Sequence, residues 1–186
     1  EGEPITVYAD AHRLGVPARL DLFEQTVEAV AYAHRRLVVH RDLKPSNVLV
    51  AEADGVPHVK LLDFGIARLL DTDADALTRP EHRVLTPEYA APEQARGEPI
   101  TTAADVYALG VILYELLTGG RPTGPDPVAP SGALTEAAAR AKGTTYDRLA
   151  RTLRGDLDTL ALAALRADPE RRYASAEALL DDLRRY

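Results

Sequence analysis

The chain has 186 residues, of which 46% are hydrophobic and 27% are charged, a composition typical of a globular domain with one sizeable core. Its net charge of -7 argues against a protein that mainly covers a nucleic-acid backbone. The absence of cysteine excludes disulfides, thiolate nucleophiles and cysteine-ligated metals, and the five scattered histidines lack the short spacing of a zinc site.

The first third of the chain predicts one long helix followed by a small β-ribbon. Residues 18–34 place apolar side chains at three- and four-residue steps, the stripe of an amphipathic helix, and His34 falls on that stripe. A loop with an Asp-Gly pair separates the last two of three short β-type runs that follow. These runs are Leu37–Val39, Val48–Val50 and Val59–Leu62.

The rest of the chain predicts a helical body. Residues 69–98 are rich in Asp, Thr, Arg and Pro without a sustained period, which predicts a long functional loop. Residues 103–118 are apolar nearly all round and end at a Gly-Gly pair, which predicts a buried central helix with Asp105 as the acid of its first turn. After a Gly- and Pro-rich connection, further helices are expected at 134–142, 144–153, 157–166 and from the cap Ser175 to Leu183.

The longest apolar stretch, residues 106–114, is far shorter than the roughly 20 residues that span a bilayer. We therefore expect no membrane contact from this segment. The net charge of -7 leads us to expect no nucleic-acid partner. We also expect a cytoplasmic location, with any membrane anchor outside the segment. The chain contains no Met and begins at Glu1 without a signal segment, so we expect it to be a piece of a longer protein.

The segment from His40 to Asn47 reads HRDLKPSN and brings an acid, a cation and an amide into one short loop between two of the predicted β runs. Phosphoryl transfer requires a proton acceptor for the substrate hydroxyl, positive charge near the γ-phosphate, and metal ligands. The segment resembles the catalytic loop of protein kinases, in which Asp42, Lys44 and Asn47 match those catalytic roles in order.

Three further segments follow in the order of the same family. Asp63-Phe64-Gly65 comes 16 residues after Asn47, and the resemblance makes Asp63 and Asn47 the magnesium ligands. Ala91-Pro92-Glu93 closes the intervening loop, and Asp105 matches the buried acid that holds the catalytic-loop backbone. Each short motif alone has an ordinary alternative, such as a turn or a helix-terminal charge, but chance is a poor explanation for their joint order.

The resemblance implies further roles one residue at a time. Leu49 looks like the floor of the adenine pocket, and Ser46 would offer a backbone carbonyl near the ribose. His40 and Phe64 match a stacked hydrophobic column of active kinases, although core packing explains His40 equally well. The implied cofactors are ATP and Mg²⁺.

The partners implied by the resemblance are proteins with Ser or Thr hydroxyls. Lys44 followed by Pro45 resembles the serine/threonine version of the catalytic loop, and Thr86, before Pro87-Glu88, fits the substrate loop of the same class. Leu85 departs from the pattern, since many relatives have Gly there. Residues 63–68, 89–94 and 167–174 look most like bacterial members of the eukaryotic-type (Hanks-type) family.

Structural and regulatory roles are also implied. Glu93 and Arg172 match a pair that forms a buried ion pair in this family. Arg41, which precedes the catalytic acid, would form a cationic socket for a phosphate on the substrate loop. Thr78 is the first candidate for that phosphorylation and Thr72 the second, because a phosphate there could pair with Arg41.

The expected fold is α+β and protein-kinase-like. Residues 1–186 would form only the mainly α-helical C-terminal lobe with a small β-ribbon, from the hinge edge to the last helix. The Gly-rich loop, strand Lys and helix Glu of the N-terminal lobe have no match in the chain, so the N-lobe is expected to lie outside it and the fragment alone to be inactive.

The full-length enzyme would transfer the γ-phosphate of ATP to Ser or Thr hydroxyls, and three other classes compete with this hypothesis. Intact Asp42, Asn47 and Asp63 weigh against a pseudokinase scaffold. Lys44 and the Ala-Pro-Glu motif weigh against a small-molecule kinase. An interaction module stays open for the isolated fragment.

Overall fold

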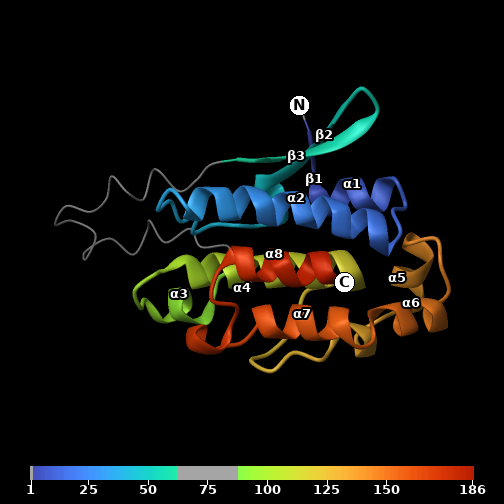
Figure 1. Cartoon of the computed structure of the whole chain (residues 1–186). Coiled ribbons are helices and arrows are strands. Elements are labelled where there is room, and N and C mark those ends of the chain that lie inside the picture. Colours follow the sequence, from blue (N-terminus) through green and yellow to red (C-terminus); the bar gives the residue numbers. More distant parts are fainter. Residues whose placement is uncertain (1, 63–87) are drawn as a thin grey trace.

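Two long helices, α2 (Val16–His34) and α4 (Thr102–Thr118), form the centre of this computed structural model, which describes residues 2–62 and 88–186. The Thr101 hydroxyl accepts a hydrogen bond from the Ala103 amide and so caps the first turn of α4. Helix α2 packs against α4 on one side and against α8 (Ala176–Arg185) along its length (Figure 1). The predicted central helix is confirmed, since most side chains of α4 are buried.

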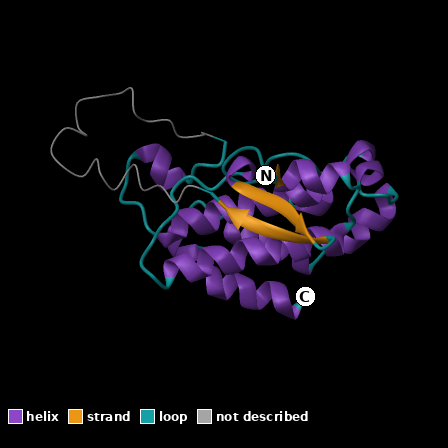
Figure 2. Cartoon of the chain, turned by 90° about the horizontal axis from the view of Figure 1, so that it is seen from above, coloured by secondary structure: helices purple, strands orange, loops and turns teal. Residues whose placement is uncertain are grey.

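A three-stranded antiparallel sheet covers the outer side of α2, as the view from above in Figure 2 shows. The hairpin turn uses Asp54 and Gly55, whose φ angles of 53° and 76° fit a two-residue turn between twisted strands. The predicted hairpin is therefore confirmed, and each strand is longer than the run that predicted it. In spatial order the strands are β1 (Glu3–Pro4), β2 (Val48–Ala53) and β3 (Val56–Leu61).

Strand β2 has a core face and an outer face because successive side chains of a strand point in opposite directions. Val48 and Val50 are buried against the helices, whereas the half-buried Leu49 faces the other way. Leu49 is paired with Pro4 of β1 and Lys60 of β3. The sequence pattern thus places Leu49 on the side of the sheet that the helices do not cover.

The remaining helices confirm the predicted helical body. Gly110 lets α4 approach the end of α7 (Asp156–Ala164) closely, since a Cβ at this position would lie 2.8 Å from the Cβ of Ala164, the last residue of that helix. Ser175 caps α8 as predicted, with its hydroxyl accepting from the Ala178 amide. The other helices are α1 (Ile5–Ala11), α3 (Pro92–Arg96), α5 (Glu136–Ala141) and α6 (Tyr146–Leu153), with 3₁₀ turns at Pro45–Asn47, Pro130–Gly132 and Pro169–Arg171.

The predicted strand at Leu37–Val39 is wrong. Leu37 takes a left-handed conformation with φ 61° and is 93% exposed. Its amide donates to the His34 carbonyl, and the Val38 amide donates to the Ala33 carbonyl at 3.0 Å. These bonds satisfy the last carbonyls of α2, so the apolar run closes a helix instead of joining a sheet.

Two helices were not predicted. In α1, Ile5, Tyr8 and Ala9 are buried at helical spacing, and this tertiary burial overrides the low helix propensity of its β-branched residues. In α3, Pro92 occupies the first turn, and the loop predicted over 69–98 is therefore wrong at 92–96. Residues 69–87 of that prediction lie outside the described part of the chain. None of the helices in the described ranges has the length and apolarity needed to cross a bilayer.

A buried lysine lies where α5 meets the end of α4. Lys142 is 4% exposed, its Nζ has no hydrogen-bond partner among the described residues, and a Cβ on Gly119 would lie 4.0 Å from that nitrogen. Burial, followed by the charge of Arg19, lowers the pKa of Lys142 from 10.5 to about 8, while Asp10 acts in the opposite direction.

We expect the free energy of unfolding to rise with pH above about 8, because there the unfolded chain binds a proton at Lys142 that the folded chain does not. Lys142→Met should raise stability near neutral pH and flatten this rise, since it removes the buried charge and keeps an unbranched side chain. Urea unfolding at several pH values between about 7 and 9.5 measures the effect. Lys60→Met, at an exposed position of β3, is the control, and an equal pH slope in both variants would contradict the assignment.

Candidate active site

The buried carboxylate of Asp105 fixes the backbone of the loop that begins at His40. Asp105 Oδ2 accepts from the His40 amide at 2.7 Å, and Oδ1 accepts from the Arg41 amide at 2.8 Å. The Nε2 of His34 lies 2.8 Å from Oδ2, so α2 and α4 meet at the same carboxylate. Asp105 is 1% exposed, and hydrogen bonds of this kind to a buried carboxylate are strong. The predicted role of Asp105 as a structural anchor agrees with these contacts.

The three residues predicted to be catalytic lie together. Lys44 Nζ is 2.9 Å from Asp42 Oδ2, and the two side chains are 22% and 28% exposed. The Asn47 side chain donates through Nδ2 to the Asp42 carbonyl at 2.8 Å, while Nδ2 is 3.5 Å from Asp42 Oδ2. The Oδ1 atom of Asn47 accepts no hydrogen bond from the described residues. The loop thus presents a carboxylate, an ammonium and an amide oxygen that are partly open to solvent.

The end of β3 is attached to the same loop. The Leu62 amide donates to the Asn47 carbonyl at 2.9 Å, and the imidazole Nε2 of His40 lies 2.8 Å from the Leu62 carbonyl. His40 is 1% exposed, which agrees with the packing role predicted for it. These contacts hold the last described residue before Asp63 beside the catalytic loop.

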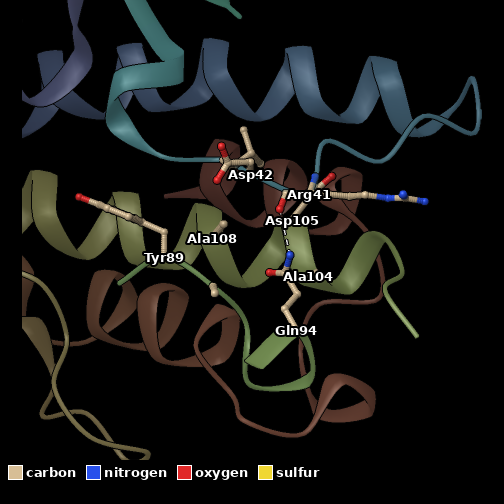
Figure 3. A pocket seen from close by; sticks show the side chains of 9 residues that line it. Arg41, Asp42, Tyr89, Gln94, Ala104, Asp105 and Ala108 are labelled. Carbon is tan, nitrogen blue, oxygen red and sulfur yellow. Dashed lines mark hydrogen bonds between the residues drawn. The ribbon is translucent and has the colours of Figure 1, made fainter. Parts of the chain in front are cut away.

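Figure 3 shows the other side of the loop, where a small cavity of about 10 Å³ separates it from the segment that follows residue 87. Gln94 Nε2 donates to the Arg41 carbonyl at 2.9 Å, and Gln94 Oε1 accepts from the Ala91 amide. Arg41 has a left-handed φ of 68°, and its guanidinium extends away from the Asp42 carboxylate. The strained backbone at Arg41 is therefore held from two sides, by Asp105 and by Gln94.

The ion pair predicted between Glu93 and Arg172 is present and buried. Arg172 Nη1 and Nη2 donate to the two Glu93 carboxylate oxygens at 2.6 and 2.7 Å. The same guanidinium also donates to the carbonyls of Arg166, Ala103 and Ala167. It therefore joins the start of α3, the start of α4 and the segment before α8.

A second contact joins the same segment to α4. The Tyr89 hydroxyl donates to Glu115 Oε2 at 2.6 Å. Burial, with this bond as the second cause, raises the pKa of Tyr89, so the phenol stays protonated. Arg121 lies 5.8 Å from the centre of the Tyr89 ring and pairs with Glu88 at 3.3 Å. The described end of the predicted substrate loop is thus fixed on α4.

The predicted nucleotide residues are placed in part. Leu49 lies on the uncovered face of β2, and Ser46 is exposed in the 3₁₀ turn before it. Among the described residues, no group of three His, Asp or Glu side chains is arranged to hold a metal ion. Asp63, Phe64, Thr72, Thr78, Leu85 and Thr86 lie outside the described residues.

Sequence reasoning missed two residues that shape the loop. His34 was placed on the apolar stripe of its helix, and it is buried, but its contact with Asp105 was not predicted. Gln94 was not singled out. Gln94 is the third residue of α3, three positions after the N-cap Ala91, and this spacing matches the capping-box pattern only loosely because Ala91 lacks a capping hydroxyl.

Comparisons with known proteins agree with this geometry. The family model described as the protein kinase domain matches residues 11–183. The kinase PknB of Mycobacterium tuberculosis is 34% identical over 165 residues, and pkn3 of Myxococcus xanthus is 41% identical over 165 residues. These matches cover 88% and 87% of this chain, but only 25% and 30% of the relatives. PkaA of Streptomyces coelicolor is 52% identical over 103 residues, which are 55% of this chain and 19% of that protein.

A solved kinase domain has the same fold. The PknI kinase domain of Mycobacterium tuberculosis superimposes with a TM-score of 0.69 at 26% identity. The match covers all of this chain and 62% of that domain. The family model, the relatives and the fold agree with the order of the sequence motifs. The chain therefore belongs to the protein kinase domain family, among the eukaryotic-type serine/threonine kinases of bacteria.

Proposed function

We propose that residues 1–186 are the C-terminal lobe of a serine/threonine protein kinase, which transfers the γ-phosphate of ATP to Ser or Thr hydroxyls of proteins. The main support is the cluster of Asp42, Lys44 and Asn47 on a loop whose backbone is fixed by Asp105. The names of the bacterial relatives support the Ser/Thr class. The match to 62% of a solved kinase domain supports the assignment to one lobe.

In this proposal the Asp42 carboxylate accepts the proton of the substrate hydroxyl as it attacks. Lys44 lies 2.9 Å from that carboxylate and places its positive charge where the transferred phosphoryl group carries negative charge. Catalysis of this type depends on positioning and electrostatic stabilisation. The bonds from Asp105 to the amides of His40 and Arg41 fix the backbone directly before Asp42. They therefore position the Asp42 carboxylate although the loop has no regular secondary structure there.

The residues present fit ATP and Mg²⁺ as cofactors. Asn47 bonds to the protein through its Nδ2 atom, and its amide oxygen is the kind of hard ligand that Mg²⁺ prefers. Asp63 would be the second protein ligand, and Leu49 on the uncovered face of β2 would lie under the adenine, with the Ser46 carbonyl near the ribose. When bound, the metal neutralises charge on the β- and γ-phosphates.

The regulatory roles belong to the same proposal. Thr86 would position the substrate hydroxyl, and a phosphate on Thr78 would pair with Arg41. The Arg41 guanidinium has no carboxylate partner among the described residues and points away from Asp42, which supports a socket for an added anion. Glu93 and Arg172 are structural in this scheme.

The proposal is tested with the full-length protein, ATP and Mg²⁺. We expect phosphoserine or phosphothreonine, and no phosphotyrosine, on a generic acceptor protein.

Asp63→Ala should abolish the magnesium-dependent part of nucleotide binding, because it removes a protein ligand of the metal. Calorimetry of ATP binding with and without Mg²⁺ measures this, with Asp71→Ala as the control. Magnesium-dependent binding that survives Asp63→Ala would show that the metal assignment is wrong.

A further inference from the structure

An arginine cluster on α6 and the residue that follows it lies away from the catalytic loop. Arg148, Arg151 and Arg154 follow one another at three-residue steps, and all three are exposed. No carboxylate in the described ranges forms a salt bridge with any of them, whereas arginines of α8 are paired. In a chain of net charge -7, this cluster is a local concentration of unpaired positive charge.

Two arginines of the cluster, Arg151 and Arg154, line an open pocket of about 420 Å³ between α6 and the turn at Pro130–Gly132. One wall is fixed, because the Ser131 amide and hydroxyl both donate to the Asp158 carboxylate, at 2.8 and 2.6 Å. The Ser131 hydroxyl proton is therefore committed to the protein. The lining residues are Ser131, Tyr146, Asp147, Ala150, Arg151 and Arg154.

The lining offers mostly donors. Arg151 uses its Nε to donate to the Asp147 carbonyl at 3.2 Å, which leaves both terminal nitrogens for a ligand. Neither the Arg154 guanidinium nor the Tyr146 hydroxyl has a hydrogen-bond partner in the part of the chain that the structure describes. Two guanidinium groups and a phenol match the oxygens of a phosphomonoester, which carries a charge of about -1.5 to -2. A single carboxylate would leave one of the two guanidinium groups unpaired.

We propose that this pocket binds a phosphorylated Ser or Thr segment of a substrate protein. The proposal rests on the proposed function, because a Ser/Thr kinase produces such phosphomonoesters on its own substrates. Helix α6 lies at the end of the helical body opposite to α3 (Figure 1). A substrate phosphorylated at one position could thus be held at α6 while another hydroxyl reaches Asp42. Asp147 opposes anion binding and sets a limit to the affinity.

The test is fluorescence anisotropy with the full-length protein, without ATP, at about 0.15 M salt, where exposed charges are well screened. The probes are the labelled peptide Gly-Ser-Ala-Thr-Ala-Ser-Gly with and without a phosphate on its Thr. We expect binding of the phosphorylated peptide only. Replacing both Arg151 and Arg154 by Gln should weaken it at least about tenfold, since each charge-assisted bond is strong. Asp147→Asn should tighten it, and Arg166→Gln, at an exposed and unpaired arginine, should leave it unchanged.

Equal binding of the two peptides, or an equal loss in the Arg166→Gln control, would overturn the proposal. So would binding of phosphatidylglycerol vesicles in place of the peptide, which would assign the pocket to a membrane surface. Melting curves of each variant check that the fold is kept. The titration is repeated with Asp42→Asn protein, in which binding should persist without phosphoryl transfer. Peptide binding and phosphoryl transfer are thus measured separately, so the pocket proposal and the catalytic proposal can each be contradicted without the other.

Discussion

Asn in place of Asp42 should lower kcat of the full-length enzyme by about 10²–10⁴-fold, the range that a positioned general base contributes. Asn has nearly the same shape as Asp but cannot accept the hydroxyl proton. The Asp42–Lys44 pair is also lost, but with side chains 28% and 22% exposed it contributes only about 0–1 kcal/mol to stability. The melting temperature should therefore change little while turnover nearly disappears.

The measurement is phosphate incorporation into an acceptor protein under saturating ATP, together with a thermal melt of the same preparation. Asp54→Asn serves as the control, because Asp54 is exposed in the hairpin turn with φ 53°, a conformation that Asn adopts readily. Near-normal turnover of the Asp42→Asn enzyme would contradict the assignment of Asp42 as the general base. A large drop in melting temperature would show that the carboxylate is structural instead.

Arg172→Ala should reduce the free energy of unfolding by roughly 3–5 kcal/mol, the usual cost of breaking a buried ion pair from one side. Glu93, which is 3% exposed, would be left as a buried charge without its bidentate partner. The carbonyls of Ala103 and Ala167 would also lose their donors. For a domain of this size the loss corresponds to a fall in melting temperature of roughly 6–20 °C.

Differential scanning calorimetry of the kinase domain measures this loss, and Arg171→Ala provides a matched control. Arg171 is the adjacent arginine, it is exposed, and it forms no ion pair with any described residue, so its removal should cost little. Equal effects at the two positions would contradict the assignment. Arg172→Lys should also be destabilising, because an ammonium cannot reproduce the fork that reaches both oxygens of Glu93.

The parts of the fold that follow from local patterns were predicted well. Apolar side chains at helical spacing located α2, a stretch that is apolar nearly all round located α4, and the Asp54–Gly55 pair located the hairpin. The proximity of Asp42, Lys44 and Asn47 could also be predicted, because the three residues lie within one short loop. Local sequence constrains such features directly.

The features that sequence could not supply depend on distant partners. Leu37 lies in an apolar run, but its amide completes the end of α2 and its side chain stays exposed. Helix α1 has weak propensity and forms because Ile5 and Tyr8 are buried. Gln94 reaches the Arg41 carbonyl across 53 positions of sequence, which no local pattern encodes. Tertiary packing decided each of these outcomes.

The anchoring of the catalytic loop by Asp105 has a consequence for the order in which the protein acquires its shape. The bonds from Asp105 to His40 and Arg41 span 65 and 64 positions of sequence, and the contact with His34 spans 71. A nascent chain that has emerged only as far as the HRDLKPSN segment contains every catalytic side chain of that loop but lacks the carboxylate that fixes its backbone. Since such long-range contacts form only after the intervening chain has closed on itself, the loop gains its geometry only once α4 has been synthesised and docks against α2.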